Sequence, residues 1–502
     1  MITRAFSVCF EGIEPQLVEI ECAISPGLPA FSFIGLSDNA VSEARDRIRS
    51  ALGALSIALP SHRIMINLSP ADMPKEGWHL DLPIALALLA TLKFITNEDC
   101  EGALAIGENS LDGRLQPVVG ALPAALKAAE LGEDLCCPET SGAEAAWVDA
   151  TRVFATKSLR AIIQHLTGQA PREPAVARQI TPHESMLDLA EVRGQERANR
   201  ALEIAAAGRH HMFLVGPPGS GKSMMAARMV SILPPLNAME ALETSMIQSV
   251  ARLLGSDGIQ STRPFREPHH TASMAAIVGG GKGAIPGEIS LAHNGILFLD
   301  ELPEFPRHVL ETLRQPLETG EVMISRANAN VKYPCKFSLI AAANPCKCEF
   351  MSDPDQACGR APNCGNDYLG QISGPLMDRF DLRIEVPAVG FQDLSLLASG
   401  ERSHVIAKRV LAARALQDTR YANTEIATNS DLKGDAMDRL IQMEEDAKTY
   451  LEQEATKLNL TARGFHRVIR VARTIADLEQ SENVARHHVG EAISFHNRVN
   501  AA

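Results

Sequence analysis

The segment that most restricts the fold of this chain is "GPPGSGKS", residues 216–223, which matches the phosphate-binding pattern G-x-x-x-x-G-K-[ST]. It follows the apolar run "HMFLV" and precedes the helix-forming run "MMAARMVSIL". A strand, a glycine-rich turn and a helix in this order place backbone N–H groups and a helix N-terminus around a phosphate. The pattern therefore predicts a nucleotide-binding α/β domain. Its predicted phosphate-binding residues are Gly216, Pro217, Pro218, Gly219, Ser220, Gly221, Lys222 and Ser223.

The side chains that complete such a site follow later apolar runs. In "GILFLDEL" the apolar run is followed by Asp300 and Glu301, and "KFSLIAAAN" ends in Asn344. In a parallel sheet these strand ends lie at the phosphate crevice. We expect Lys222 to neutralise the β- and γ-phosphates of ATP, and Ser223 and Asp300 to hold Mg²⁺. Glu301 is the general-base candidate, and Asn344 would orient the attacking water. Any strand can end in acids, however, and an asparagine before a proline also suits a turn.

An arginine far along the chain is the remaining phosphate candidate. Arg379 stands in "GPLMDRFDLRIEVP", between a predicted short helix and a strand. The guanidinium is a fork that stays charged, which suits contact with a γ-phosphate. Its distance from the phosphate loop in the sequence indicates that it serves the site of a neighbouring subunit. The alternative is a surface ion pair with Asp378 or Asp381.

Length and charge limit the remaining interpretation. A chain of 502 residues predicts several domains. The net charge of −13 argues against a generally cationic nucleic-acid coat protein, but it is compatible with a locally basic channel. The sequence has neither an 18-residue apolar run nor a signal-peptide pattern, so we expect a cytoplasmic protein without a membrane span. The predicted domains are 1–167, mixed α and β; 168–187, a linker; 188–390, the α/β ATPase; and 391–502, helical.

Four of the ten cysteines lie in one loop, "NPCKCEFMSDPDQACGRAPNC", residues 344–364. Without an export signal, disulfides are disfavoured. Four thiolates on one loop suit tetrahedral Zn²⁺, although this spacing is looser than the usual paired C-x₂-C knuckles. Reduced thiols, an iron–sulfur cluster and a redox switch remain open alternatives. The candidate ligands are Cys346, Cys348, Cys358 and Cys364.

Longer strings resemble one family. With the motifs above, "RPFREPHHTASMAAIVGGGKGAIPGEISLAHNGILFLDELPEF", "PGLPAFSFIGLSDNAVSEARDRIRSAL" and "TARGFHRVIRVARTIADL" resemble the magnesium-chelatase-like AAA+ family, in its ComM/YifB branch, over the whole chain. The resemblance implies a P-loop AAA+ module with a C-terminal helical lid, ATP and Mg²⁺ as ligands, and assembly into a hexamer. It also maps a second phosphate-sensing arginine to Arg463, with Arg467 as the alternative.

The resemblance further implies a channel-facing hairpin within residues 263–289. Lys282 is then the first candidate for contact with the DNA backbone, because phosphate contacts need only cations and flexible backbone. A glycine-rich surface loop is the plain alternative, and a histidine metal pair is a third interpretation. The weaker DNA candidates are Arg263, Arg266, His269 and His270.

For activity, the resemblance implies an ATP-driven motor that promotes branch migration on single-stranded or branched DNA during recombination in natural transformation. A recombinase is a further candidate partner. Two other functions share the AAA+ core: a chelatase motor that drives metal insertion into a porphyrin, and a protein-remodelling machine.

The leading domain, residues 1–167, resembles the Lon peptidase domain, an α+β fold of the ribosomal S5 domain 2 type. A Lon-type site needs a serine activated by a lysine. The matching stretch "PKEGWHLDLPIA" contains no serine, and Pro123 stands where the lysine belongs. We therefore expect a non-catalytic domain, with a displaced Ser69–Lys75 dyad as the alternative.

Overall fold

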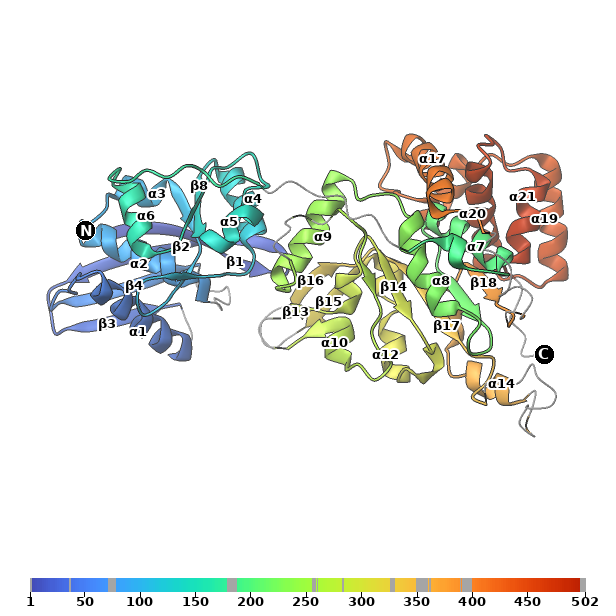
Figure 1. Ribbon diagram of the computed structural model, residues 1–502, viewed down its shortest axis with the longest axis horizontal. Coiled ribbons are helices and arrows are strands. Elements are labelled where there is room, and N and C mark those ends of the chain that lie inside the picture. Colours follow the sequence, from blue (N-terminus) through green and yellow to red (C-terminus); the bar gives the residue numbers. More distant parts are fainter. Residues whose placement is uncertain are drawn as a thin grey trace.

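A computed structural model gives the arrangement of the chain (Figure 1). It describes residues 2–35, 38–70, 78–177, 187–254, 259, 261–281, 284–325, 330–348, 360, 363–388, 390 and 400–496. Figure 1 shows an α/β body in blue and cyan, a second α/β body in green and yellow, and helices in orange and red at the far end. No helix among the described residues combines the length and apolar character needed to cross a membrane.

The first body is a seven-stranded sheet in the order β3-β4-β2-β1-β5-β8-β9. Strands β1 and β2 form an antiparallel hairpin, whereas β5, β8 and β9 are parallel. Helix α2 is buried over nearly its whole length against β1 and β2, as its sequence "DLPIALALLAT" requires. The strands are β1 (Ile2–Glu11), β2 (Glu14–Ser25), β3 (Ala30–Ile34), β4 (Arg63–Ser69), β5 (Ala103–Ala105), β8 (Asp134–Pro138) and β9 (Val153–Thr156). The helices are α1 (Asp38–Ala54), α2 (Asp81–Thr91), α3 (Asn97–Glu101), α4 (Ala121–Leu131), α5 (Glu139–Ala145) and α6 (Leu159–Leu166), with a small hairpin of β6 (Glu108–Asn109) and β7 (Leu115–Gln116).

The second body is a parallel five-stranded sheet in the order β11-β14-β17-β10-β18. Both faces are covered: Met212 and Leu214 of β10 enter one hydrophobic core, and Phe213 and Val215 enter another. A doubly buried parallel strand needs such an uninterrupted apolar run. The strands are β10 (Met212–Val215), β11 (Phe265–Arg266), β14 (Ile296–Leu299), β17 (Ser338–Ala343) and β18 (Leu382–Glu385). The helices around them are α7 (Glu196–Gly208), α8 (Lys222–Arg228), α9 (Ala238–Val250), α10 (Met274–Val278), α11 (Glu288–Leu291), α12 (Arg307–Thr312), α13 (Pro316–Thr319), α14 (Asn363–Leu369) and α15 (Gly374–Met377).

Two small hairpins pack together beside this sheet. One is β12 (Gly279–Gly280) with β13 (Ile285–Pro286), and the other is β15 (Glu321–Ser325) with β16 (Asn330–Pro334). The Tyr333 hydroxyl donates to the Ala284 carbonyl at 2.9 Å, which ties the hairpins to each other. The first hairpin lies within the predicted insertion, whereas the second was not predicted from the sequence.

The C-terminal region is helical. Helix α20 packs against α7, α17 and α21, and its apolar face joins the same core as Met212. The helices are α17 (Ser403–Tyr421), α18 (Asp435–Leu440), α19 (Glu445–Lys457), α20 (Ala462–Leu478) and α21 (Arg486–Ser494).

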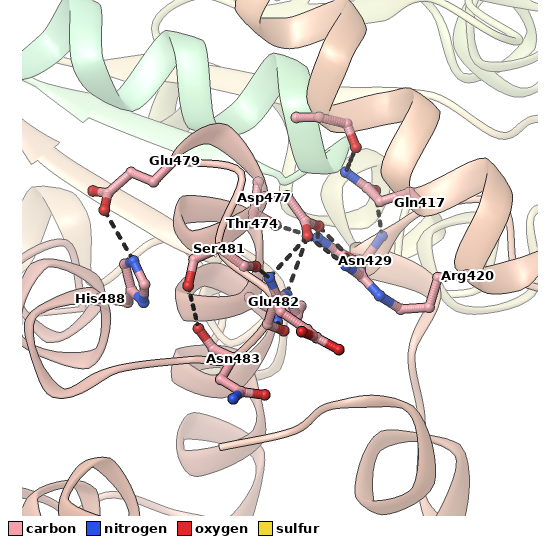
Figure 2. Close-up of polar contacts among 12 residues, drawn as sticks. Gln417, Arg420, Asn429, Thr474, Asp477, Glu479, Ser481, Glu482, Asn483 and His488 are labelled. Atoms are coloured by element: carbon pink, nitrogen blue, oxygen red, sulfur yellow. Dashed lines mark hydrogen bonds and ion pairs between the residues drawn. The ribbon is translucent and has the colours of Figure 1, made fainter. Parts of the chain in front are cut away.

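A buried polar network fixes these helices. Asp477 is fully buried and accepts hydrogen bonds from Arg420 and Asn429, which point toward it in Figure 2. Arg473 donates to Asp477 and to the carbonyls of Ser481 and Glu482. A buried carboxylate is tolerated only when it is paired and hydrogen-bonded in this way.

The two α/β bodies are joined by direct contacts. The Ser249 hydroxyl on α9 donates to the Glu144 carboxylate on α5 and accepts from the Gly120 N–H at 3.1 Å. Gly12, which has a φ of 70°, lies against β16, and a Cβ atom there would come within 2.6 Å of the Lys332 carbonyl oxygen. Glycine is therefore needed where the β1–β2 turn touches the second body.

Candidate nucleotide site

The phosphate loop connects β10 to α8 at the carboxyl edge of the sheet. Gly219 and Gly221 have φ angles of 74° and 87°, a left-handed conformation that favours glycine. At Gly216 a Cβ atom would lie 2.2 Å from the Val386 carbonyl oxygen. All three glycines of the motif are therefore required by the backbone, and the loop leads directly into the N-terminus of α8, where an anion is favoured.

Lys222 is held inside this loop. Its Nζ donates to the carbonyls of Gly216 at 2.7 Å and Pro217 at 2.9 Å, and to Asn344 Oδ1 at 3.2 Å. The ammonium thus lies between the loop and the end of β17, with the side chain mostly buried. The structure brings together two residues that the sequence predicted for one site.

Ser223 and Asp300 also meet. The Ser223 hydroxyl donates to Asp300 Oδ2 at 2.6 Å, and the Glu301 N–H donates to Asp300 Oδ1 at 2.9 Å. A hydroxyl beside a carboxylate is the oxygen donor set that Mg²⁺ prefers, with water and phosphate completing its octahedral shell. These residues therefore fit the predicted Mg²⁺ ion.

Glu301 has an unusual backbone conformation. Its φ is 51°, in the left-handed region that a glutamate rarely adopts, and strain of this kind clusters at functional sites. Its side chain is about half exposed, with Oε2 3.4 Å from His270 Nδ1. Burial, and to a smaller extent the charge of Asp300, raises the pKa of Glu267, a residue that was not predicted from the sequence. Carboxylates gathered at one strand edge strengthen the case for a divalent cation.

The predicted arginines lie at the opposite edge of the sheet. Arg379 precedes β18 by three residues, and β18 runs parallel to β10, so Arg379 lies at the amino end where the phosphate loop lies at the carboxyl end. Its Nη2 donates to Glu318 Oε2 at 2.6 Å. The predicted alternative, a pair with Asp378 or Asp381, is therefore not the contact that the structure shows.

Arg379 and Arg463 line one hollow of about 610 Å³ between the sheet and the C-terminal helices. Arg463 is exposed at the start of α20, whereas Arg467 is buried and donates to the Phe380 carbonyl at 2.8 Å. This difference favours Arg463 over Arg467 for contact with a ligand. Among the described residues, the buried Nε atoms of Arg379, Arg467 and Arg470 have no hydrogen-bond partner. The hollow therefore has spare donors for an anion.

Comparison with known proteins agrees with this architecture. Family models match residues 188–394 (Magnesium chelatase, subunit ChlI), 20–141 (Subunit ChlI of Mg-chelatase) and 400–496 (Magnesium chelatase, subunit ChlI C-terminal). YifB of Salmonella typhimurium is 42% identical over 96% of this chain and 95% of its own. Competence protein ComM of Haemophilus influenzae is 39% identical over 96% and 95%. The chain belongs to the ComM/YifB branch of the magnesium-chelatase-like AAA+ family.

Membership of this family implies ATPase activity with ATP and Mg²⁺. A more distant relative is the magnesium-chelatase 38 kDa subunit of Rhodobacter capsulatus, 25% identical over 59% of this chain and 82% of its own. The AAA+ core is thus shared with a chelatase subunit, whereas the ComM and YifB relatives match nearly the full length.

The structure describes all of the candidate DNA-contacting residues except Lys282. Lys282 lies outside the described residues. Arg263 pairs with Glu240, and Arg266 pairs with Glu288, so both are engaged within the fold. His269 Nδ1 lies 2.8 Å from the Thr271 hydroxyl. Lys332 on β16, which was missed in the sequence, has a side chain that is 64% exposed, with its Nζ 3.8 Å from Glu321 Oε2. The signal that could have found it is the alternation in "NVKYP", where buried and exposed residues alternate.

Three of the four loop cysteines converge. The sulfur atoms of Cys346, Cys348 and Cys364 all lie within 4.8 Å of one another, and those of Cys346 and Cys348 are 2.9 Å apart. Cys358 lies outside the described residues. Cys346 follows Asn344 by two positions, and Cys364 lies in α14.

A second group of metal-type side chains is Glu479, His487 and His488. The Ala485 N–H donates to His488 Nδ1 at 2.9 Å, so the proton of a neutral ring is on Nε2. That nitrogen donates to Glu479 Oε2 at 3.0 Å (Figure 2). A protonated nitrogen has no lone pair for a metal, so this group is a hydrogen-bonded helix contact.

In the first body, side chains in the stretch that resembles the Lon serine site make contacts within the fold. Asp81 is buried and accepts from Arg47 Nε at 2.6 Å, and burial raises its pKa to about 6. His79 Nε2 lies 2.8 Å from the Val8 carbonyl oxygen. Ser69 ends β4, and Lys75 lies outside the described residues. The likeness to Lon peptidases and the loss of catalysis both stay predictions.

Proposed function

We propose that this chain is an ATP-hydrolysing DNA motor that promotes branch migration as a ring of six copies. One observation carries the proposal: the groups suited to ATP chemistry are divided between the two ends of one parallel sheet. Lys222 and Asp300 lie at the carboxyl edge, and Arg379 lies at the amino edge. A single chain cannot bring both to one phosphate. Identical copies joined head to tail complete the site and close into a ring.

Within one subunit, Lys222 and the backbone N–H groups of its loop hold the β- and γ-phosphates. Ser223 and Asp300 hold Mg²⁺, which neutralises phosphate charge when bound. Glu301 accepts a proton from the attacking water. Asn344 orients that water and accepts a hydrogen bond from Lys222. Contacts between Lys222 and Asn344 and between Ser223 and Asp300 support the roles of these four residues.

The neighbouring subunit supplies Arg379, whose guanidinium stabilises the charge that builds on the γ-phosphate. Arg463 opens on the same hollow and adds a second cation. ATP hydrolysis then depends on the subunit interface, so that each turnover is coupled to movement of one subunit against the next.

DNA is the favoured substrate for two reasons. The relative of 39% identity is named as a competence protein, and the two packed hairpins present backbone and an exposed lysine, Lys332. Six copies of a few cations give strong, salt-dependent binding even when the net charge is negative. The likeness to a magnesium-chelatase subunit supports the second candidate, a chelatase-type motor without a DNA substrate.

The deciding experiment measures ATP turnover with and without single-stranded DNA and a four-way junction, together with movement of that junction. We expect DNA to stimulate turnover and the junction to migrate only with ATP. The Lys222→Ala variant should lose both activities. Turnover that is indifferent to DNA, with no migration, would favour the chelatase-type motor.

We also propose that Cys346, Cys348 and Cys364 bind a structural Zn²⁺ ion. Three converging thiolates suit zinc, and a metal would order a loop too small to form its own core. The wild-type chain should contain about one zinc per copy by elemental analysis. The Cys346→Ser and Cys364→Ser variants should lose it, whereas Cys137→Ala, a buried thiol in β8, should retain it. Iron in place of zinc, or a Cys346–Cys348 disulfide in protein purified without added oxidant, would contradict the assignment.

A further inference from the structure

Arg379 is already occupied by an anion from its own chain. Its Nη2 donates to Glu318 Oε2 at 2.6 Å, and its buried Nε has no partner among the described residues. The Arg379 side chain is 22% exposed, whereas that of Glu318 is 58% exposed. Glu318 is therefore the more solvent-accessible partner of the pair, and both residues line the hollow.

Glu318 lies among three cations, not one. The hydrogen bond and charge of Arg379, with smaller contributions from Lys433 and Arg463, lower the pKa of Glu318. Lys433 Nζ also donates to the Glu318 backbone carbonyl at 3.1 Å. Two other carboxylates of the hollow contact different cations: Asp381 contacts His210 and Arg470, and Asp431 pairs with Arg209. Glu318 is thus the acid that stands where a phosphate would meet Arg379.

We propose that Glu318 is a positioning residue that occupies Arg379 until the γ-phosphate bound by the neighbouring subunit displaces it. This inference rests on the proposed function, because it assumes that Arg379 acts across the interface. While Nη2 of Arg379 donates to Glu318, the same nitrogen cannot take part in a bidentate hydrogen bond to a phosphate. Because the Glu318 side chain is 58% exposed, solvent screens its attraction to Arg379, and a multiply charged phosphate can replace it.

The test compares kcat and KM for ATP in the full chain without DNA. Glu318→Gln removes the competing charge and keeps the side-chain size, so KM should fall about two- to fivefold while kcat stays within about twofold. Glu318→Asp keeps the charge and should restore KM toward the wild-type value. Glu311→Gln on α12, a partly exposed carboxylate that pairs with Arg314, is the matched control and should change neither parameter.

A binding measurement separates affinity from turnover. In the Glu301→Gln background, ATP should bind about two- to fivefold more tightly when Glu318→Gln is added. An unchanged or raised KM for Glu318→Gln, or a fall in kcat alone, would overturn the inference and make Glu318 an ordinary structural partner.

Arg379→Ala distinguishes this failure from failure of the proposed function. If Arg379→Ala abolishes turnover while Glu318→Gln leaves KM unchanged, only the role of Glu318 is wrong. If Arg379→Ala keeps wild-type turnover, the shared site itself is wrong, and the inference fails with it.

Discussion

At the scale of single residues, long-range contacts decide which polar groups form the site. Lys222 and Asn344 are 122 positions apart, and Ser223 and Asp300 are 77 positions apart, yet each pair is within hydrogen-bond distance. The parallel sheet explains this, because strand ends at one edge must meet. Glu301 differs from its neighbours because it points toward His270 and has a strained backbone.

The first prediction concerns Glu301. Glu301→Gln should reduce ATP turnover by about 10²-fold or more, because the amide cannot accept the proton of the attacking water. Binding of ATP should remain, as measured with a fluorescent nucleotide. Glu304→Gln, three residues along, serves as the control and should keep wild-type turnover. A Glu301→Gln variant that hydrolyses ATP at the wild-type rate would exclude Glu301 as the base.

At the scale of elements, backbone contacts fix how hairpins and strands pack. Gly279 has a φ of 107°, and a Cβ atom there would lie 2.5 Å from Ile324 Cδ1 on β15. The same Cβ atom would also lie 2.7 Å from the Ile285 carbonyl oxygen, so glycine is needed where β12 packs against β13 and against Ile324. His211, just before β10, connects the strands on both sides of β10. Its Nδ1 accepts from the Leu339 N–H of β17, and its carbonyl accepts from the Leu382 N–H of β18.

The second prediction concerns Gly279. Gly279→Ala should separate the hairpins, accelerate proteolysis between residues 279 and 334, and reduce stimulation of turnover by DNA. Gly281→Ala is the matched control, because Gly281 also has a positive φ, of 71°, but a Cβ atom there meets nothing within 4 Å. Equal effects of the two substitutions would show that backbone strain, not hairpin contact, is responsible.

The third prediction concerns pH. Burial, with the charges of Arg209, His210 and Arg470 adding to it and that of Asp381 opposing it, lowers the pKa of His211 to about 4. Between pH 6.5 and 4 the unfolded chain therefore binds a proton that the folded chain does not. The titration of His211 therefore leaves the free energy of unfolding unchanged above about pH 6.5 and lowers it as the pH falls. At pH 5 the expected loss is about 1–2 kcal/mol.

Thermal melting from pH 8 to pH 5 checks this sign. His211→Gln keeps an acceptor for the Leu339 N–H but does not titrate, so its melting temperature should fall less than that of the wild type on acidification. His62→Gln, at an exposed position, should follow the wild type. A variant at position 211 that loses stability as steeply as the wild type would contradict the role of His211.

At the scale of the whole molecule, the two edges of one sheet appear on opposite faces of the ATPase body. The phosphate loop follows β10 and Arg379 precedes β18, and these neighbouring strands run in the same direction. The first α/β body is attached to the same domain through Ser249 and Glu144. A ring of such subunits would alternate loop and arginine around its circumference.

The fourth prediction tests this arrangement by mixing subunits. Lys222→Ala and Arg379→Ala should each be inactive alone, because each lacks one half of every site. In a one-to-one mixture, about a quarter of the interfaces would join an intact loop to an intact Arg379 if copies assemble at random. ATP turnover should therefore recover to about that fraction of the wild-type rate. No recovery in a mixture that still forms mixed rings, as measured by native mass spectrometry, would place both halves in one subunit.

Much of the ATPase core could be predicted because its signals are contiguous. The strands β10, β14 and β17 are apolar runs, and the phosphate loop carries its backbone requirements in its own glycines. Glu267 and Glu318 were missed because their role depends on what packs beside them. Glu318 sits in an ordinary polar stretch, and no pattern in it indicates a partner 61 positions away.

The sequence by itself determined the phosphate loop, the acids at the end of β14 and the family, since these depend on neighbouring residues or on long matching strings. Only the tertiary structure decided that Arg379 and Arg463 share a hollow away from the loop, that Glu318 occupies Arg379, and that three cysteines converge beside Asn344. The physical reason is that strand order, strand direction and helix packing set these distances. They arise from the burial of apolar faces throughout the chain and not from any local pattern.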